Sequence, residues 1–243
     1  MQAWEALLRW KESQPSFRGW VLREGVRMAF RLDEHLMEHM DVFQSKEPSA
    51  PRGFIDQRKR LSESWLELLR PSGYYKRREE ALARGQQPAT PRTILHLHGG
   101  GYLIGLLDPY RYISLNYLRR TEADLVATLD YRHAPEHVFP AALDDAVDAW
   151  HYLLAQGCQP EQVVVVGDSA GANLALGLML RLRDEGDPLP GGAVLMSPWA
   201  DMTFSGASIY TKRFEDPMFG VRAGEELRPE NYLRFTRYLG DHD

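Results

Sequence analysis

Hydrophobic positions along the 243-residue chain change their spacing near residue 90. In residues 1–90 apolar side chains recur three or four residues apart, as at Leu32, Leu36 and Met40, which predicts a mostly helical segment. Residues 76–92 are dense in charge and predict a solvated surface excursion. From residue 93 onward, short apolar runs alternate with helical patterns.

This alternation predicts the order of strands and helices in the second part of the chain. The expected strands are 93–98, 124–131, 162–167 and 192–197, and the expected helices are 141–157 and 170–185. Such a pattern favours an α/β fold, with a mostly parallel sheet covered by helices on both faces. The helix over 170–185 is apolar nearly all round, which predicts a central position.

Composition narrows the class of protein. Hydrophobic residues make up 44% of the chain, which is enough for one well-buried core. The net charge of −5 disfavours a nucleic-acid partner or an anionic membrane surface. The single cysteine, Cys158, excludes an intrachain disulfide. We find no secretion signal and no apolar run long enough to span a membrane, so we expect a soluble, cytoplasmic protein.

The motif Gly167-Asp168-Ser169-Ala170-Gly171 lies where a predicted buried strand ends and a helix begins. A serine on such a sharp turn is held exposed, beside the free N–H groups and the positive dipole end of the helix. This is the setting of a catalytic nucleophile. The pattern alone also allows a plainer interpretation, in which Ser169 is a helix N-cap and the glycines permit close packing.

A second glycine motif follows the first strand of the predicted sheet. His98 precedes Gly99, Gly100 and Gly101, and their uncovered N–H groups are suited to binding a developing oxyanion. A flexible loop and a phosphate cradle are the alternatives. A dinucleotide-binding fingerprint would need glycine at position 104, which is Ile104. The serine motif further along the chain favours the oxyanion interpretation.

Histidine pairs are the remaining candidates for chemistry. His96 and His98 lie two residues apart on one predicted strand, a spacing that suits a metal ion. We predict no metal site, because no carboxylate is tied to this pair. We interpret His133 and His137 as structural histidines.

Four segments together carry a family resemblance. They are His98-Gly-Gly-Gly-Tyr102, Tyr131-Arg-His-Ala-Pro-Glu-His-Val-Phe-Pro-Ala-Ala142, Gly167-Asp-Ser-Ala-Gly-Ala-Asn173 and Ser197-Pro-Trp-Ala-Asp201. In this order they resemble the hormone-sensitive-lipase-like (family IV) bacterial carboxylesterases, over about residues 93–220. Two positions depart from the pattern: His133 stands where the family usually has Leu, and Ala172 where it usually has Gly.

The resemblance implies an α/β-hydrolase three-layer sandwich with a helical N-terminal cap. Ser169 matches the family's nucleophile, and the N–H groups of Gly100, Gly101 and Ala170 match its oxyanion hole. The positions that match supporting parts of the motifs are His98, Gly99, Glu136, Asp168 and Asn173. The implied substrate is a small-molecule ester, and no cofactor is implied.

The catalytic base is the point at which the sequence departs most from the family. In this fold the nucleophile is followed along the chain by an Asp or Glu and then by a His. The only histidine after Ser169 is His242, and a residue so close to the end of the chain lacks rigid support. We therefore expect the triad acid and histidine, with the late strands and helices of the fold, to be missing from this chain.

Two functions remain open on the sequence. The first is a serine carboxylesterase that acts through an acyl-enzyme on Ser169, although this chain would be inactive because it lacks the triad acid and histidine. The alternative is a non-catalytic small-ligand-binding protein on the same scaffold. We predict a helical cap over 1–55, a core over 56–200, and over 201–243 a second cap segment with the start of the truncated C-terminal part. Without the late strands, an exposed sheet edge would favour self-association.

Overall fold

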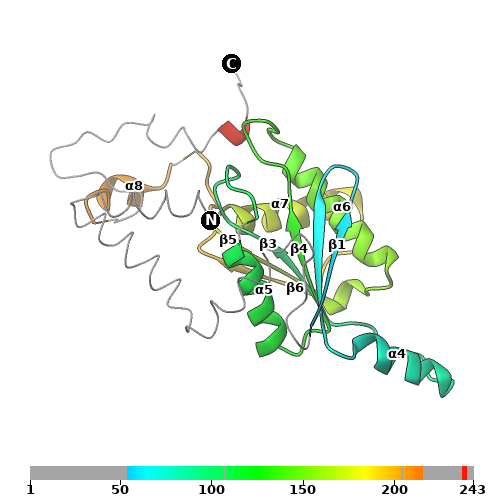
Figure 1. Cartoon of the computed structure of the whole chain (residues 1–243). Coiled ribbons are helices and arrows are strands. Elements are labelled where there is room, and N and C mark those ends of the chain that lie inside the picture. The colour runs from blue at the N-terminus through cyan, green and yellow to red at the C-terminus, as the bar shows by residue number, and fades with distance from the viewer. Residues whose placement is uncertain (1–53, 107, 204, 216–236, 240–243) are drawn as a thin grey trace. The chain divides into compact units, whose positions relative to one another are not determined.

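The computed structural model describes residues 54–106, 108–203, 205–215 and 237–239 (Figure 1). Residues 201–215 belong to a different compact unit from the sheet, and each unit is described by itself. Nearly all of the predicted N-terminal cap lies outside the described residues, as does His242. The predicted domain boundaries stay predictions.

Six strands form one sheet in the order β1-β2-β4-β3-β5-β6. They are β1 (Phe54–Arg60), β2 (Trp65–Pro71), β3 (Thr93–Leu97), β4 (Leu125–Asp130), β5 (Val163–Asp168) and β6 (Gly192–Met196). Strands β4, β3, β5 and β6 are parallel neighbours, whereas β2 runs antiparallel to both β1 and β4. The mostly parallel sheet predicted from the alternation of strands and helices is confirmed.

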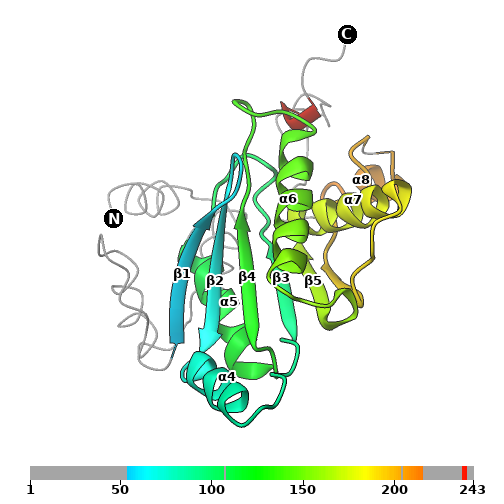
Figure 2. The same cartoon turned by 90° about the vertical axis from the view of Figure 1, so that its right-hand side faces the viewer.

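Helices cover both faces of this sheet and form the outer layers of the fold. In the unit that contains the sheet, the helices are α4 (Tyr74–Ala83), α5 (Asp108–Arg120), α6 (Ala141–Ala155) and α7 (Ala170–Glu185), with short 3₁₀ turns at Pro160–Gln162 and Arg237–Leu239. The short helix α8 (Ala207–Thr211) belongs to the other unit. Helix α5 packs on β2 and β4, while α6 and α7 lie on the opposite face (Figure 2). This arrangement is the predicted three-layer sandwich.

The core forms where strands β3 and β5 meet helices α6 and α7. Leu95, Leu97 and Val165 on the strands are fully buried, as are Trp150 on α6 and Leu178 on α7. Burying a large aliphatic or aromatic side chain contributes about 1.5–3 kcal/mol each. These residues fix the carboxyl ends of β3 and β5 side by side, which positions the loops that follow.

Residues 54–71 correct the expectation of a mostly helical first part. They form the antiparallel pair β1–β2, and β2 pairs in turn with β4. In β2, four consecutive residues from Leu66 to Leu69 are buried, so the segment shows neither helical nor alternating spacing. The charged excursion includes the ten-residue helix α4, which has no buried residue and therefore is solvated as predicted.

Two further features differ from the sequence expectations. Helix α5 was not predicted, although Tyr112, Leu115 and Leu118 form a buried stripe at three-residue spacing. Helix α7 is central along one side only, because Leu180 is 50% exposed.

Strand β6 forms one edge of the sheet within the described residues. Its Val194 and Met196 are 48% and 38% exposed. The self-association expected of an open edge stays a prediction. No helix in the described part of the chain is long and apolar enough to cross a membrane.

Candidate active site

Ser169 occupies the turn between strand β5 and helix α7. Its backbone has φ 52° and ψ −119°, in a region that residues with a side chain rarely adopt. The turn is held by three backbone hydrogen bonds: Ser169 N–H donates to Met196 O at 3.0 Å, and Ser169 O accepts from Asn173 N and Trp199 N at 3.1 and 3.2 Å. Ser169 is the N-cap residue of α7, but its hydroxyl makes no capping hydrogen bond to a helix N–H.

The glycines beside this turn are required by close backbone contacts. A Cβ atom on Gly171 would overlap the carbonyl oxygen of Leu97 and lie 2.5 Å from that of His98. A Cβ atom on Gly167 would lie 2.5 Å from the carbonyl carbon of Gly171. The first turn of α7 therefore presses directly on the end of β3, and that contact brings the serine beside the glycine loop.

Asp168 joins the serine turn to the glycine loop. Its Oδ1 accepts a hydrogen bond from Gly99 N at 3.0 Å, and its Oδ2 accepts one from Tyr110 OH at 3.1 Å. Burial raises the pKa of the Asp168 carboxyl above its usual value, although both donors act in the opposite direction. A Cβ atom on Gly99 would lie 2.9 Å from the Tyr110 hydroxyl, so only glycine fits this junction.

The glycine loop turns sharply after Gly99. Gly100 and Gly101 have φ +123° and +65°, conformations that glycine adopts without strain. Gly100 O accepts hydrogen bonds from the N–H groups of Leu103 and Ile104. Among the described residues, the N–H groups of Gly100, Gly101 and Ala170 have no acceptor. These are the three donors that the sequence assigned to the oxyanion hole.

A series of hydrogen bonds through Tyr102 and Asn173 stabilises the glycine loop. Tyr102 is 1% exposed, and its hydroxyl donates to Asn173 Oδ1 at 2.6 Å. Asn173 Nδ2 donates in turn to Trp199 O at 2.8 Å. The ring of Tyr102 stacks on Tyr238 at a centroid distance of 3.7 Å. Asn173 thus links the glycine loop to the segment that follows β6.

His98 is locked into the structure on both sides of its ring. Its Nδ1 bonds to Gly99 O at 2.8 Å, and its ring stacks on Tyr131 at 4.3 Å. The Tyr131 hydroxyl donates to His98 O at 2.7 Å. Burial lowers the pKa of His98 to about 4, so the ring is neutral at pH 7. The structure does not bring Glu136 into this network, because that residue is exposed and has no hydrogen-bond partner among the described residues.

Sequence reasoning assigned no role in the site to Tyr110 or Tyr131. Both contact the glycine loop or its partners, Tyr110 from helix α5 and Tyr131 from the residue after β4. The three-residue spacing of apolar positions in α5 was the available signal for the first. Nothing in the local sequence marks the second as a partner of the His98 backbone.

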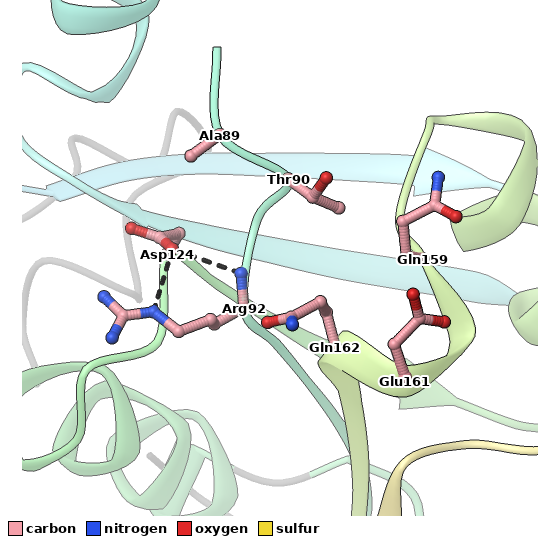
Figure 3. Close-up of a pocket in the computed structure, with 7 residues that line it drawn as sticks. All are labelled: Ala89, Thr90, Arg92, Asp124, Gln159, Glu161 and Gln162. Atoms are coloured by element: carbon pink, nitrogen blue, oxygen red, sulfur yellow. Dashed lines mark hydrogen bonds and ion pairs between the residues drawn. The ribbon is translucent and has the colours of Figure 1, made fainter.

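A separate cavity of about 520 Å³ lies at the end of the sheet opposite Ser169 (Figure 3). It lies at the amino ends of the strands, because Arg92 directly precedes β3 and Gln162 directly precedes β5. Arg92 donates to Asp124 Oδ2 from its backbone N and its Nε. Open α/β sheets bind their ligands at the carboxyl ends of the strands. We therefore assign the functional site to that end, where Ser169 lies.

Comparison with known proteins decides the family. Residues 94–237 match the family described as "alpha/beta hydrolase fold". The chain belongs to the alpha/beta hydrolase fold family. The match includes the glycine loop and the serine turn.

Curated relatives of this hydrolase-fold chain include two bacterial enzymes. An acetyl-hydrolase of Streptomyces hygroscopicus is 48% identical over 145 residues, which are 60% of this chain and 48% of that protein. An esterase of Acinetobacter venetianus is 36% identical over 177 residues, which are 72% of this chain and 57% of that protein. The chain thus spans about half the length of these curated relatives.

Solved structures give the same answer for this hydrolase-fold chain. A crystal structure of the esterase EstE5 superposes with a TM-score of 0.63 at 33% identity, covering 85% of this chain and 61% of that one. An esterase from the bacterial hormone-sensitive lipase (HSL) family superposes with a TM-score of 0.62 at 29% identity, covering 84% and 67%. The chain is similar to hormone-sensitive-lipase-like carboxylesterases, as the motifs predicted.

Proposed function

We propose that the protein is a serine-dependent carboxylic ester hydrolase whose nucleophile is Ser169. One observation carries the proposal: Ser169 sits at positive φ between β5 and α7, and its neighbour Asp168 is hydrogen-bonded to Gly99 of the glycine loop. Relatives named as an acetyl-hydrolase and an esterase support an ester as the substrate. A small-molecule acyl ester fits this reaction, and the proposed chemistry needs no cofactor.

The reaction proceeds in two halves on these residues. Ser169 Oγ attacks the ester carbonyl carbon while its proton passes to a general base, and the carbonyl electron pair moves onto oxygen. The N–H groups of Gly100, Gly101 and Ala170 donate to that oxyanion. The intermediate then expels the protonated alcohol and leaves an acyl group on Ser169, which water hydrolyses. One well-placed oxyanion donor contributes a factor of about 10²–10³ in rate.

Asp168 and Asn173 act as positioning residues in this scheme. Asp168 ties the loop to the serine turn through Gly99, and Asn173 ties it through Tyr102. Preorganised donors need no rearrangement when the charge develops, which is why a network away from the reacting atoms affects the rate.

The general base sets how fast the chain turns over. The sequence after Ser169 contains one histidine, His242, which lies outside the described residues. In the serine protease subtilisin, loss of the general base lowers turnover by about 10⁶. We therefore expect this chain by itself to hydrolyse esters slowly, with a serine that responds to an added base.

The test supplies that base from solution. Hydrolysis of p-nitrophenyl acetate is followed for the wild-type chain, Ser169→Ala and the matched control Ser197→Ala, each with and without imidazole. Ser197 is a suitable control because it also follows a strand and has a positive φ of 44°. We expect imidazole to raise the protein-dependent rate of the wild type and of Ser197→Ala, but not of Ser169→Ala.

Equal rates in the wild type and Ser169→Ala under all conditions would refute the nucleophile assignment. Ester binding without any hydrolysis by the wild type, even with imidazole, would favour the alternative of a ligand-binding protein.

A further inference from the structure

Three side chains capable of binding a metal lie close together at the carboxyl ends of β3 and β4. His98 follows strand β3, Asp130 ends strand β4, and His133 lies in the loop after β4. Because β3 and β4 are adjacent parallel strands, their carboxyl ends lie at the same edge of the sheet. One ligand atom from each of the three residues lies within 4.8 Å of the others.

One ring nitrogen of His98, Nε2, is available to bind a ligand. The His98 ring is fully buried, and its Nε2 has no hydrogen-bond partner. Its Nδ1 faces the carbonyl oxygen of Gly99 at 2.8 Å, and because a carbonyl only accepts, Nδ1 carries the proton. The unpartnered Nε2 therefore holds a lone pair. A backbone carbonyl that fixes the tautomer in this way is the usual outer contact of a metal-bound histidine.

His133 supplies a second unsatisfied nitrogen. Its Nε2 is buried and has no hydrogen-bond partner. Its ring lies 5.6 Å from that of His98 and 4.9 Å from that of Tyr131, measured between centroids. A buried polar atom without a partner costs about 1–3 kcal/mol, and two such nitrogens in one cluster are accounted for by a shared ligand.

Asp130 supplies the oxygen. Its Oδ2 accepts from Arg58 Nη2 at 2.8 Å, while its Oδ1 has only a long contact of 3.4 Å with Leu106 N. Carboxylates that bind metals are commonly held by a second hydrogen bond of this kind, so Arg58 orients the group and leaves Oδ1 free.

We propose that His98, Asp130 and His133 form a binding site for one Zn²⁺ ion, with water as the fourth ligand. Two imidazoles and one carboxylate are a ligand set that zinc accepts in tetrahedral geometry. Ligand atoms of such a site lie about 3.3 Å apart at the usual bond lengths, so binding requires the Asp130 and His133 side chains to rotate toward the fixed His98 ring. The site is independent of the ester-hydrolysis proposal and goes beyond the sequence prediction, which considered no carboxylate beside these histidines.

The bound ion would connect two strands at the point where the glycine loop begins. His98 directly precedes Gly99, so a bond from its Nε2 to zinc restrains the loop in addition to the hydrogen bond from Gly99 to Asp168. The ion binds the folded chain and not the unfolded one, so it raises the melting temperature.

The test measures metal binding by the full chain after treatment with a chelator. Zn²⁺ is titrated by isothermal calorimetry, and Co²⁺ is used as a spectroscopic probe of four-coordination. The variants are His133→Leu, Asp130→Asn and the matched control His137→Leu, whose histidine is exposed and outside the cluster. The change His133→Leu removes one ligand and puts an apolar side chain at the position where the family resemblance leads one to expect leucine. Circular dichroism verifies that each variant is folded.

We expect one Zn²⁺ per wild-type chain, a higher melting temperature with zinc, and unchanged binding in His137→Leu. In His133→Leu the affinity should fall on the order of 100-fold or more, and in Asp130→Asn it should also fall. The proposal is overturned if the wild type binds no zinc, or if His133→Leu binds it as tightly as the wild type. If His133→Leu does not fold, Asp130→Asn decides by the same criterion.

Discussion

Helix α7 contains two glycines with opposite surroundings. At Gly171, in the first turn, an added Cβ would overlap the carbonyl oxygen of Leu97 at the end of β3. At Gly177, two turns further on, the nearest neighbour is Leu143 Cδ1 at 3.6 Å, an ordinary contact. The first turn is therefore fitted against backbone that cannot move aside, whereas the rest of the helix packs through side chains.

This difference shows that the first turn of α7 positions the site, whereas the rest of the helix packs in the core. The contact of Gly171 with β3 and the bond from Gly99 to Asp168 bring two loops together that lie about 70 residues apart in the chain. Beyond the first turn, α7 supplies buried leucines to the core and leaves Leu180 half exposed. Changes at the first turn should thus affect both stability and the site, and changes beyond it stability alone.

The largest expected effect comes from exchanging the two glycines for alanine one at a time. Gly171→Ala should lower the free energy of unfolding by about 3 kcal/mol, because overpacking against fixed backbone forces the helix away from β3. Gly177→Ala should raise it by about 0.5–1 kcal/mol, because alanine is the better helix former and has room. Urea denaturation of the two variants and the wild type measures both values.

The two substitutions remove no functional group and insert the same methyl group into the same helix. If both change stability by similar amounts in the same direction, the contrast between the two parts of α7 is wrong.

A smaller effect is expected from Asp168→Asn, and it depends on pH. Burial raises the pKa of the Asp168 carboxyl in the folded chain, so folding disfavours its ionised form. The asparagine keeps an oxygen to accept from Gly99 and carries no charge. The wild type should therefore lose stability relative to Asp168→Asn as the pH rises from below the carboxyl's unfolded pKa through its raised folded pKa.

Urea denaturation of both proteins across this range, at constant ionic strength, gives the difference in their unfolding free energies. A wild type that instead gains stability over Asp168→Asn with rising pH would mean that the donors Gly99 and Tyr110 outweigh burial and lower the pKa.

The sequence predicted the parallel strands and the two helices α6 and α7. The strands from β3 to β6 and the helices α6 and α7 all begin and end within two residues of their expected limits. Continuous apolar runs bounded by glycine mark such elements clearly. Strand β2 was missed because its buried run from Leu66 to Leu69 has no period, and β1 borders it as an edge strand with charged positions.

The sequence predicted those parts of the site that lie within contiguous motifs. The turn at Ser169 and the glycines at 99–101 each lie in one contiguous motif, and glycine suits the positive φ of Gly100 and Gly101. The link from Asp168 to Tyr110 was not predictable, because it depends on where an unpredicted helix lies on the sheet. The meeting of His98 with Asp130 likewise depends on the pairing of β3 with β4.

The measurement that tests the central claim most directly is the location of a covalent adduct by peptide mass spectrometry. The wild-type chain is incubated with a fluorophosphonate in the presence of imidazole, digested and mapped. A half-buried nucleophile beside oxyanion donors predicts the adduct on Ser169, with the more exposed Ser197 unmodified. An adduct spread over several serines, or one absent from Ser169 while others react, would contradict the account.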